Sequence, residues 1–196
     1  MRKMKACFSL AICLFLIFTA ACQTPVPSEE TDLNETLTGL IGQEQDDVFE
    51  TLSSLDIQME ETQQEGEYLL SNPVPYLGSE FSVYLLFERE TKQLYGFRYV
   101  ADYEKAEMES AIQSIESIYE QLGNIYGETS TYPGLGNRFS DATDVESDLS
   151  KNGSLMESWD LENHEDYVLN ATVSDMDDAH IQLKLTYQIQ KIPAVA

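Results

Sequence analysis

Strict alternation of hydrophobic and polar residues is clearest near the C-terminal end of the chain, in "AHIQLKLTYQIQ" at residues 179–190. One side of an extended chain would carry Ile181, Leu183, Leu185, Tyr187 and Ile189. The other side would carry Gln182, Lys184, Thr186, Gln188 and Gln190. A period of two predicts a β-strand, and the outward polar row predicts a sheet with one face exposed to water.

Two earlier alternating runs are joined by the short polar segment "RETK" at residues 89–92. The first run carries on one face Phe81, Val83, Leu85 and Phe87. The second run carries on one face Tyr95, Phe97, Tyr99 and Ala101. Two such runs with a short connection predict a β-hairpin. Shorter strands are predicted within residues 66–72, 128–132, 155–161 and 165–175, with a long Gly-, Ser- and Asp-rich loop after the second of them.

A helical period of hydrophobic residues appears in two places. The longer one, at residues 104–123, gathers on one face Met108, Ala111, Ile112, Ile115, Ile118, Tyr119 and Leu122. This spacing predicts an amphipathic helix with Gly123 as its C-cap. A shorter helix is predicted over residues 42–55, where Val48 and Leu52 share a face and two aspartates suit the positive end of the helix dipole.

Together these elements predict an α+β fold in which an antiparallel sheet has two helices packed on one face. Residues 38–103 and 104–192 each read as a helix followed by strands and a hairpin, so they are possible halves of a duplicated α-β-β(-β) unit. The predicted single domain spans residues 38–192, and residues 193–196 form a tail.

The N-terminal region has the pattern of an exported protein. Three basic residues precede the uncharged stretch "ACFSLAICLFLIFTAA", which ends in small residues just before Cys22. A positive segment followed by a hydrophobic one, too short for a good transmembrane helix, predicts a secretory signal at residues 1–21. Residues 22–37 are rich in Pro, Ser, Thr and acids, and are predicted to form a lipid anchor and a flexible tether.

The residues "TAAC" at 19–22 resemble the lipobox of bacterial lipoproteins, in which the cysteine sulfur receives a diacylglycerol and the new N-terminus is often acylated. Thr19 departs from the leucine that is usual at this position. The resemblance implies a protein held at the cell membrane by lipid on Cys22 and facing away from the cytoplasm. The alternative is a plain signal peptide cut at an Ala-x-Ala-like site, with Cys22 incidental.

Cysteine content and charge limit the functions open to the mature chain. All three cysteines lie in or next to the signal, so the mature chain has none left for a disulfide, a thiolate metal site or a nucleophile. Removing three of the 11 basic residues leaves 8 against 35 acidic residues, a net charge of −27. Such a surface repels phosphate backbones, so nucleic acid is not a predicted partner.

The duplicated pattern resembles small bacterial envelope proteins with a β-lactamase-inhibitor-protein-like fold. The matching residues are "GQEQDDVFETL" at 42–52 and "QLYGFRY" at 93–99. The segment "IYEQLGNIYGET" at 118–129 is also similar to a helix end in uncharacterised lipoproteins of Gram-positive bacteria. The resemblance covers residues 38–192 and implies a binding or inhibitory scaffold, but it assigns no functional residue.

Residues that could carry chemistry are few. His164 and His180 have no second His or Cys at metal-ligand spacing, so both are predicted to be exposed structural residues. The chain lacks the nucleophile-elbow, phosphate-loop and zinc-protease motifs, and no cofactor is predicted. The segment "PGLGNRF" at 133–139 predicts a tight turn in which Arg138 and Phe139 are possible partner contacts.

Two acidic clusters call for comparison with calcium loops. Asp144, Glu146 and Asp148 alternate as the ligands of hard-cation loops do, and they are weak calcium candidates. Leu149 stands where an EF-hand needs glycine, and the favoured interpretation is that no metal site exists. Residues 175–178, "DMDD", predict a hairpin turn whose Asp side chains accept hydrogen bonds from their own backbone.

These features predict a lipid-anchored, extracytoplasmic binding or interaction domain that does not catalyse a reaction. Its partner would be an unknown protein, peptide or glycan, besides the membrane itself. The 11 tyrosines, interleaved with polar residues on strands, slightly favour such binding. Two alternatives stay open: an envelope assembly or inhibitory protein with a protein partner, and a hydrolase that uses a pair of carboxylates.

Overall fold

The computed structural model describes residues 29–130, 137–161 and 167–189, which form the predicted α+β fold. The helices are α1 Glu29–Leu40, α2 Gln45–Ser54, α3 Met108–Tyr126 and α4 Val145–Asn152, with a short 3-10 turn, η1, at Lys105–Glu107. The strands are β1 Met59–Glu61, β2 Glu67–Leu70, β3 Val74–Tyr76, β4 Ser79–Phe87, β5 Leu94–Glu104, β6 Ser154–Asp160, β7 Tyr167–Asp175 and β8 His180–Ile189.

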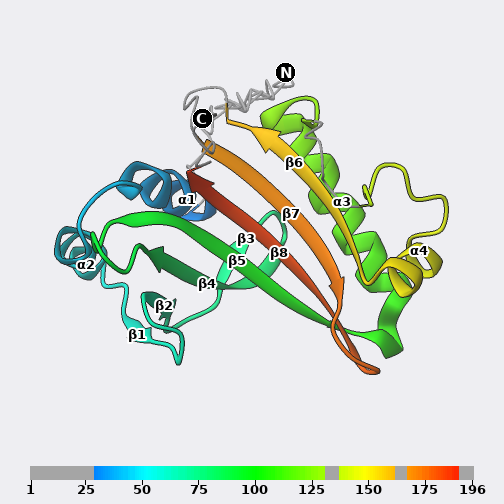
Figure 1. Cartoon of the computed structure of the whole chain (residues 1–196), viewed down its shortest axis with the longest axis horizontal. Coiled ribbons are helices and arrows are strands. Elements are labelled where there is room, and N and C mark those ends of the chain that lie inside the picture. Colours follow the sequence, from blue (N-terminus) through cyan, green and yellow to red (C-terminus); the bar gives the residue numbers. More distant parts are fainter. Residues whose placement is uncertain (1–28, 131–136, 162–166, 190–196) are drawn as a thin grey trace, which may run out of the picture.

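All eight described strands belong to one antiparallel sheet, and the last strands of the two halves pair at its centre. The order is β1-β2-β4-β5-β8-β7-β6, with β3 added beside β4. β5 and β8 pair from Gly96 opposite Gln188 to Glu104 opposite His180. Two helices precede the strands both in residues 29–104 and in the described residues after 104 (Figure 1).

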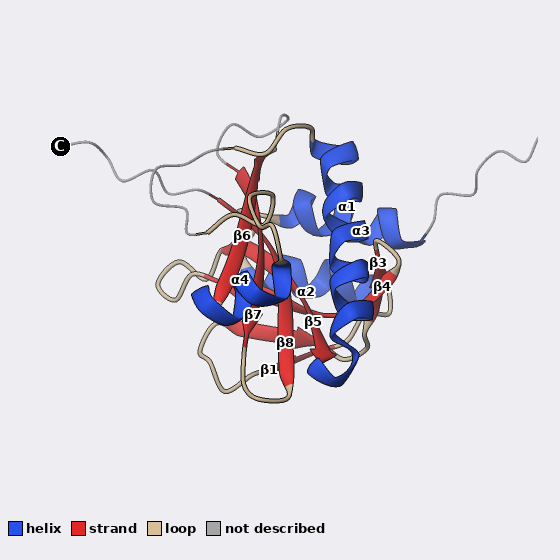
Figure 2. Ribbon diagram, turned by 90° about the vertical axis from the view of Figure 1, so that its right-hand side faces the viewer, coloured by secondary structure: helices blue, strands red, loops and turns tan. Residues whose placement is uncertain are grey.

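The helices gather on one face of the sheet, with the hydrophobic core between the two layers (Figure 2). The residues of β8 that were predicted to point inward, from Ile181 to Tyr187, are buried in that core. α3 adds to it Ala111, Ile115, Ile118, Tyr119 and Leu122. Four helices of the described residues pack here, rather than the two predicted, and none of them covers the opposite face, which we call the open face.

The domain begins earlier than predicted. Residues 22–37 were expected to form a tether, but α1 covers Glu29–Leu40. Leu37 and Leu40 are buried, and Leu33 packs against the core from one turn earlier. The prediction was wrong because three leucines at helical spacing among many polar residues give a weak signal, and tertiary packing stabilises such helices more than intrinsic propensity does.

The loop predicted after residue 132 contains a helix instead. α4 spans Val145–Asn152 and buries Leu149. It shares the pattern Asp-Val-x-x-x-Leu with α2, at residues 144–149 and 47–52. The strand predicted at 128–132 is absent from residues 128–130, and the rest of it lies outside the described residues.

α3 extends further than its glycine suggested. The helix passes through Gly123 and ends at Tyr126, and Gly127 is its C-cap with a φ of 82°. A tertiary contact accounts for the extra turn, because the Tyr126 hydroxyl lies 3.2 Å from the Tyr187 hydroxyl in the core. α2 is shorter than predicted, and Leu55 beyond its end is exposed.

A cluster of tyrosine side chains lies in the core beneath the β5–β8 pair. The hydroxyls of Tyr76 and Tyr187 are 2.8 Å apart, and the rings of Tyr76 and Tyr99 stack with centroids 4.6 Å apart. Tyr119, which lies on α3, donates a hydrogen bond to the Ala171 carbonyl. Burial raises the pKa of Tyr76, Tyr99, Tyr119 and Tyr187, mainly because each phenolate would lose its hydration.

Candidate functional site

A row of three adjoining depressions lies on the open face. Their volumes are about 540, 650 and 400 Å³, which is the size range of ligand sites. Gln64 borders all three, and Glu67 and Leu86 border two each. The three form one continuous hollow, the sheet-face groove, lined by residues 60–67, 69, 84, 86–89, 95, 98, 156, 170, 186, 188 and 189.

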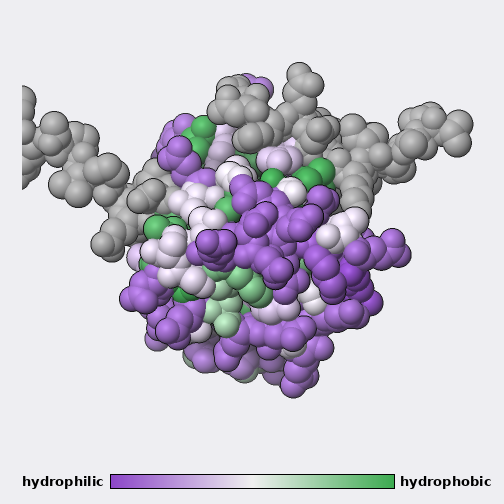
Figure 3. All heavy atoms as spheres, turned by 90° about the vertical axis from the view of Figure 1, so that its left-hand side faces the viewer, coloured by the Kyte–Doolittle hydropathy of each residue, from purple (hydrophilic) through white to green (hydrophobic). Residues whose placement is uncertain are grey.

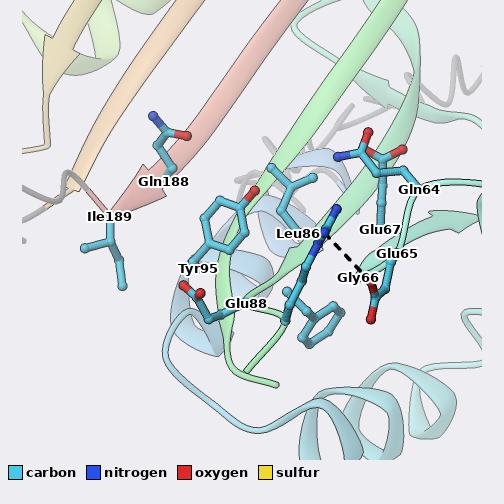
Figure 4. Close-up of a pocket in the computed structure, with 11 residues that line it drawn as sticks. Gln64, Glu65, Gly66, Glu67, Leu86, Glu88, Tyr95, Gln188 and Ile189 are labelled. Carbon is cyan, nitrogen blue, oxygen red and sulfur yellow. Dashed lines mark ion pairs between the residues drawn. The ribbon is translucent and has the colours of Figure 1, made fainter. Parts of the chain in front are cut away.

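The loop between β1 and β2 forms one wall of the groove. The Gln64 amide donates to Thr62 Oγ1 over 3.1 Å, and the Phe87 amide donates to the Gly66 carbonyl over 2.8 Å. Gly66 has a φ of 82°, and a Cβ there would lie 2.7 Å from the Phe87 carbonyl oxygen. The turn therefore requires glycine, and it holds Gln64 and Glu65 at the edge of the hollow (Figure 4).

An ion pair forms part of the floor. Arg98 Nη2 lies 2.5 Å from Glu67 Oε2, and Thr62 Oγ1 donates to the other carboxylate oxygen over 3.2 Å. The Arg98 guanidinium also lies over the Tyr84 ring, 5.6 Å from its centroid. Glu67 is only 8% exposed, so this carboxylate is neutralised within the protein and fixes the floor rather than attracting a ligand.

A β-bulge brings Tyr95 into the groove. Residues 86 and 87 of β4 pair with Gly96 and Leu94 of β5, which leaves Tyr95 as the extra residue. The prediction that Tyr95 shares the buried side of β5 with Phe97 is therefore wrong, because an extra residue shifts the alternation by one position. The Tyr95 ring stands between the end of β8 and the β1–β2 loop (Figure 4).

The groove carries more acidic than basic side chains. Its two arginines both pair with glutamates: Arg98 as described, and Arg89 with Glu65 at 3.9 Å. Glu60 and Glu61 on β1 are exposed, and neither forms an ion pair with another described residue. A negative potential therefore remains at the β1 end after the internal pairs are formed.

The two residues predicted as partner contacts are used inside the fold. Arg138 binds Glu157 Oε2 through Nε and Nη2, at 3.3 and 3.0 Å. Glu157 is 2% exposed and also accepts a hydrogen bond from the Ser140 amide. Phe139 stacks on Tyr119 with ring centroids 4.3 Å apart. Both side chains attach their loop to β6 and α3, which removes the reason for assigning them to a partner.

The calcium candidates belong to the start of a helix. Asp144 is the N-cap of α4 and accepts a hydrogen bond from the Ser147 amide over 3.0 Å, while Glu146 and Asp148 lie in the first turn. Negative charge at this end of a helix is stabilising without any metal. Among the described residues, no group of three or more His, Cys, Asp or Glu side chains is placed to hold a metal ion.

His180 and the "DMDD" segment form the predicted turn between β7 and β8. Asp177 Oδ1 accepts hydrogen bonds from the Ala179 and His180 amides, at 2.7 and 2.8 Å. The same carboxylate contacts the His180 ring, and this raises the pKa of His180 and contributes to the lowered pKa of Asp177. The prediction of a turn capped by its own Asp is confirmed, whereas His164 lies outside the described residues.

Cys22 and the predicted signal at residues 1–21 also lie outside the described residues. Within the described part of the chain, no helix is both long and apolar enough to cross a membrane.

Sequence reasoning did not identify the groove. The outward polar row of β8 predicted an exposed face, and Thr186 and Gln188 of that row do line the hollow. Glu67, Tyr84 and Arg98 come together through the pairing of β2, β4 and β5, which no local pattern encodes. The sequence does contain one signal for the groove, which is Arg98 in the middle of an alternating strand. A charged side chain at such a position must point to the exposed face of the sheet.

No protein-family model, curated protein or solved structure matches this chain.

Proposed function

We propose that this protein is a lipid-anchored, extracytoplasmic binding protein that holds a partner against the open face of its sheet without transforming it. The observation that carries this proposal is the sheet-face groove, a continuous hollow with polar amides, aromatic rings and the Glu67–Arg98 ion pair. Sheet faces left uncovered in this way present side chains at fixed spacing, which suits recognition of a partner.

The floor of the groove is preorganised for binding. Arg98 is held by Glu67 and Tyr84, and the β1–β2 loop is fixed by hydrogen bonds to β4. A rigid site binds with a smaller loss of conformational entropy than a flexible one does. Tyr84 and Tyr95, half-buried at the floor, offer amphipathic ring surface of the kind enriched in protein interfaces.

The lipid anchor follows from the signal and the "TAAC" sequence before the domain. Because α1 begins at Glu29, residues 23–28 would link the lipid to the domain, and such a link reaches at most about 25 Å. The proposal therefore places the domain close to the membrane surface, where a partner would belong to the envelope or pass next to it.

Labelling with a radioactive fatty acid tests the anchor. The wild-type protein should incorporate label, and Cys22→Ala should not. An unlabelled wild-type protein whose mature N-terminus lies elsewhere would show that the lipid anchor does not exist.

Site-specific photo-crosslinking in the producing cells tests the binding face. A benzoylphenylalanine in place of Tyr95 should yield a discrete adduct, since the probe resembles the ring that it replaces. The same probe in place of Ser117, exposed on α3 and on the helix side of the sheet, is the matched control and should yield none. Adducts of equal yield from both positions, or none from Tyr95, would contradict binding at the open face.

A further inference from the structure

The charge that remains in the sheet-face groove is unevenly placed. The centre is neutralised by the Glu67–Arg98 pair and the Glu65–Arg89 pair. The β1 end keeps Glu60 and Glu61, both exposed. The β8 end has uncharged Gln188 and Ile189 together with the carboxylate of Glu88, next to Tyr95. A ligand that fits this pattern carries most of its positive charge at the β1 end and polar or apolar groups along the rest.

We propose that the occupant of the groove is an extended, basic segment of another protein, with lysine or arginine side chains against Glu60 and Glu61. This inference rests on the proposed function and specifies its partner. Complementary charge favours such a segment, because the mature chain is strongly acidic and the groove keeps a negative end after its internal pairs are formed.

The dimensions of the groove suit a chain segment. Its lining residues come from β1, β2, β4, β5, β8, β7 and β6, which are successive neighbours in the sheet. Six strand spacings correspond to about 28 Å, and an extended peptide of about eight residues spans that length. Gln64 and Gln188 can donate to and accept from a peptide backbone, and Tyr84 and Tyr95 can pack against its side chains.

Other occupants fit this surface less well. A second copy of the chain would bring two acidic surfaces together, and nucleic acids, anionic glycans and anionic lipid heads are repelled in the same way. On the side of the molecule shown in Figure 3, where α2 and β1 lie, hydrophilic residues predominate and hydrophobic ones form small areas. A neutral glycan can donate hydroxyl hydrogen bonds to Glu60 and Glu61, but it leaves both carboxylate charges uncompensated.

The test uses the mature full-length protein and defined peptides. A fluorescent peptide of about eight residues with alternating lysine and threonine is the probe, because every second side chain of an extended chain points the same way. Peptides with glutamine or glutamate in place of lysine are its controls. Anisotropy titrations at about 150 mM salt keep long-range attraction small. We expect saturable binding of the lysine peptide alone.

Charge reversals locate the binding. Glu60→Lys with Glu61→Lys should weaken binding of the lysine peptide by about tenfold or more. Glu116→Lys with Glu120→Lys changes the net charge equally, at exposed positions of α3 on the other side of the sheet, and should change binding by less than about twofold. Equal losses in both double variants would show a non-specific field effect and overturn the inference, as would equal binding of the glutamine peptide or no saturation at all.

The crosslink at Tyr95 separates this inference from the proposed function. An adduct with a basic protein that disappears in the Glu60→Lys and Glu61→Lys variant supports both. An adduct that persists unchanged in that variant, or that is removed by glycan-cleaving enzymes, leaves the binding function standing and overturns the basic peptide as its occupant.

Discussion

The tyrosine cluster predicts a steep loss of stability at alkaline pH. Tyr76, Tyr99, Tyr119 and Tyr187 are at most 9% exposed, and burial raises the pKa of each above the ordinary value of 10. Above pH 10 the unfolded chain therefore releases protons that the folded protein retains. Stability from these groups is complete below pH 10 and falls as the pH rises further, because the unfolded state then binds fewer protons than the native state.

The size of the effect follows from the number of such groups. Each tyrosine that stays protonated in the folded state costs about 1.4 kcal/mol of stability per pH unit above 10. Four of them give about 5 kcal/mol per pH unit, and a domain of this size is stable by about 5–15 kcal/mol in total. We therefore expect the free energy of unfolding to be about 5 kcal/mol lower at pH 11 than at pH 9, and the domain to unfold between about pH 11 and pH 13.

Urea unfolding at a series of pH values measures this dependence directly, and the ultraviolet absorbance of tyrosinate reports when the rings ionise. Tyr99→Phe is the matched variant, because its hydroxyl makes one long hydrogen bond, 3.4 Å to Asn34 Oδ1. In that variant the free energy of unfolding should fall with pH about a quarter less steeply than in the wild type. A free energy of unfolding that changes by less than about 2 kcal/mol between pH 9 and pH 11 would refute the assignment of four protonated buried phenols.

Three substitutions test other parts of the fold by thermal or urea unfolding. Ile115→Asp puts an unpaired carboxylate at a fully buried position of α3 and should cost several kcal/mol or prevent folding; an unchanged midpoint would mean that this face of α3 does not pack on the sheet. Arg138→Ala leaves the buried Glu157 carboxylate without its cation and should cost about 3–5 kcal/mol, an effect that Glu157→Gln in the same protein should partly reverse. Gly96→Ala would place a Cβ 2.4 Å from the Tyr187 carbonyl oxygen and should cost about 1–3 kcal/mol, whereas Gly39→Ala in α1, with no atom within 4 Å, should be neutral or stabilising.

The elements that could be predicted are those whose own residues show a period. β8 alternates over its full length and β4 as far as Leu85, and the hydrophobic face of α3 repeats at helical spacing, so their type and buried faces are as expected. α1 and α4 bury few residues each and consist mainly of polar ones. Their helical state depends on the sheet that they contact, and the sequence of each segment alone contains little of that information.

The binding face could be predicted only in outline. An outward polar row in β8 indicates an exposed face, but the groove depends on the bulge at Tyr95 and on the turn at Gly66. Both are features of pairing between strands that lie far apart in the sequence. The sequence pointed to Arg138 and Phe139 as partner contacts because a basic and an aromatic residue stand out in this loop. In the structure both side chains attach the loop to the rest of the domain. The local sequence alone cannot distinguish such internal contacts from contacts with a partner.

The pairing of β5 with β8 at the centre of the sheet also determines the order in which the chain can fold. The two strands are separated by roughly 80 residues, so their contacts close a large loop and tend to form late. Until then one edge of β5 has unpaired backbone N–H and C=O groups, and Phe97 lacks Tyr187, the ring on which it stacks. If the chain crosses the membrane unfolded from its N-terminal end, the first half waits with this edge exposed until residues 180–189 emerge. During this interval folding competes with aggregation. The exposed edge of β5 is then the part of the chain that a chaperone outside the cytoplasm would bind.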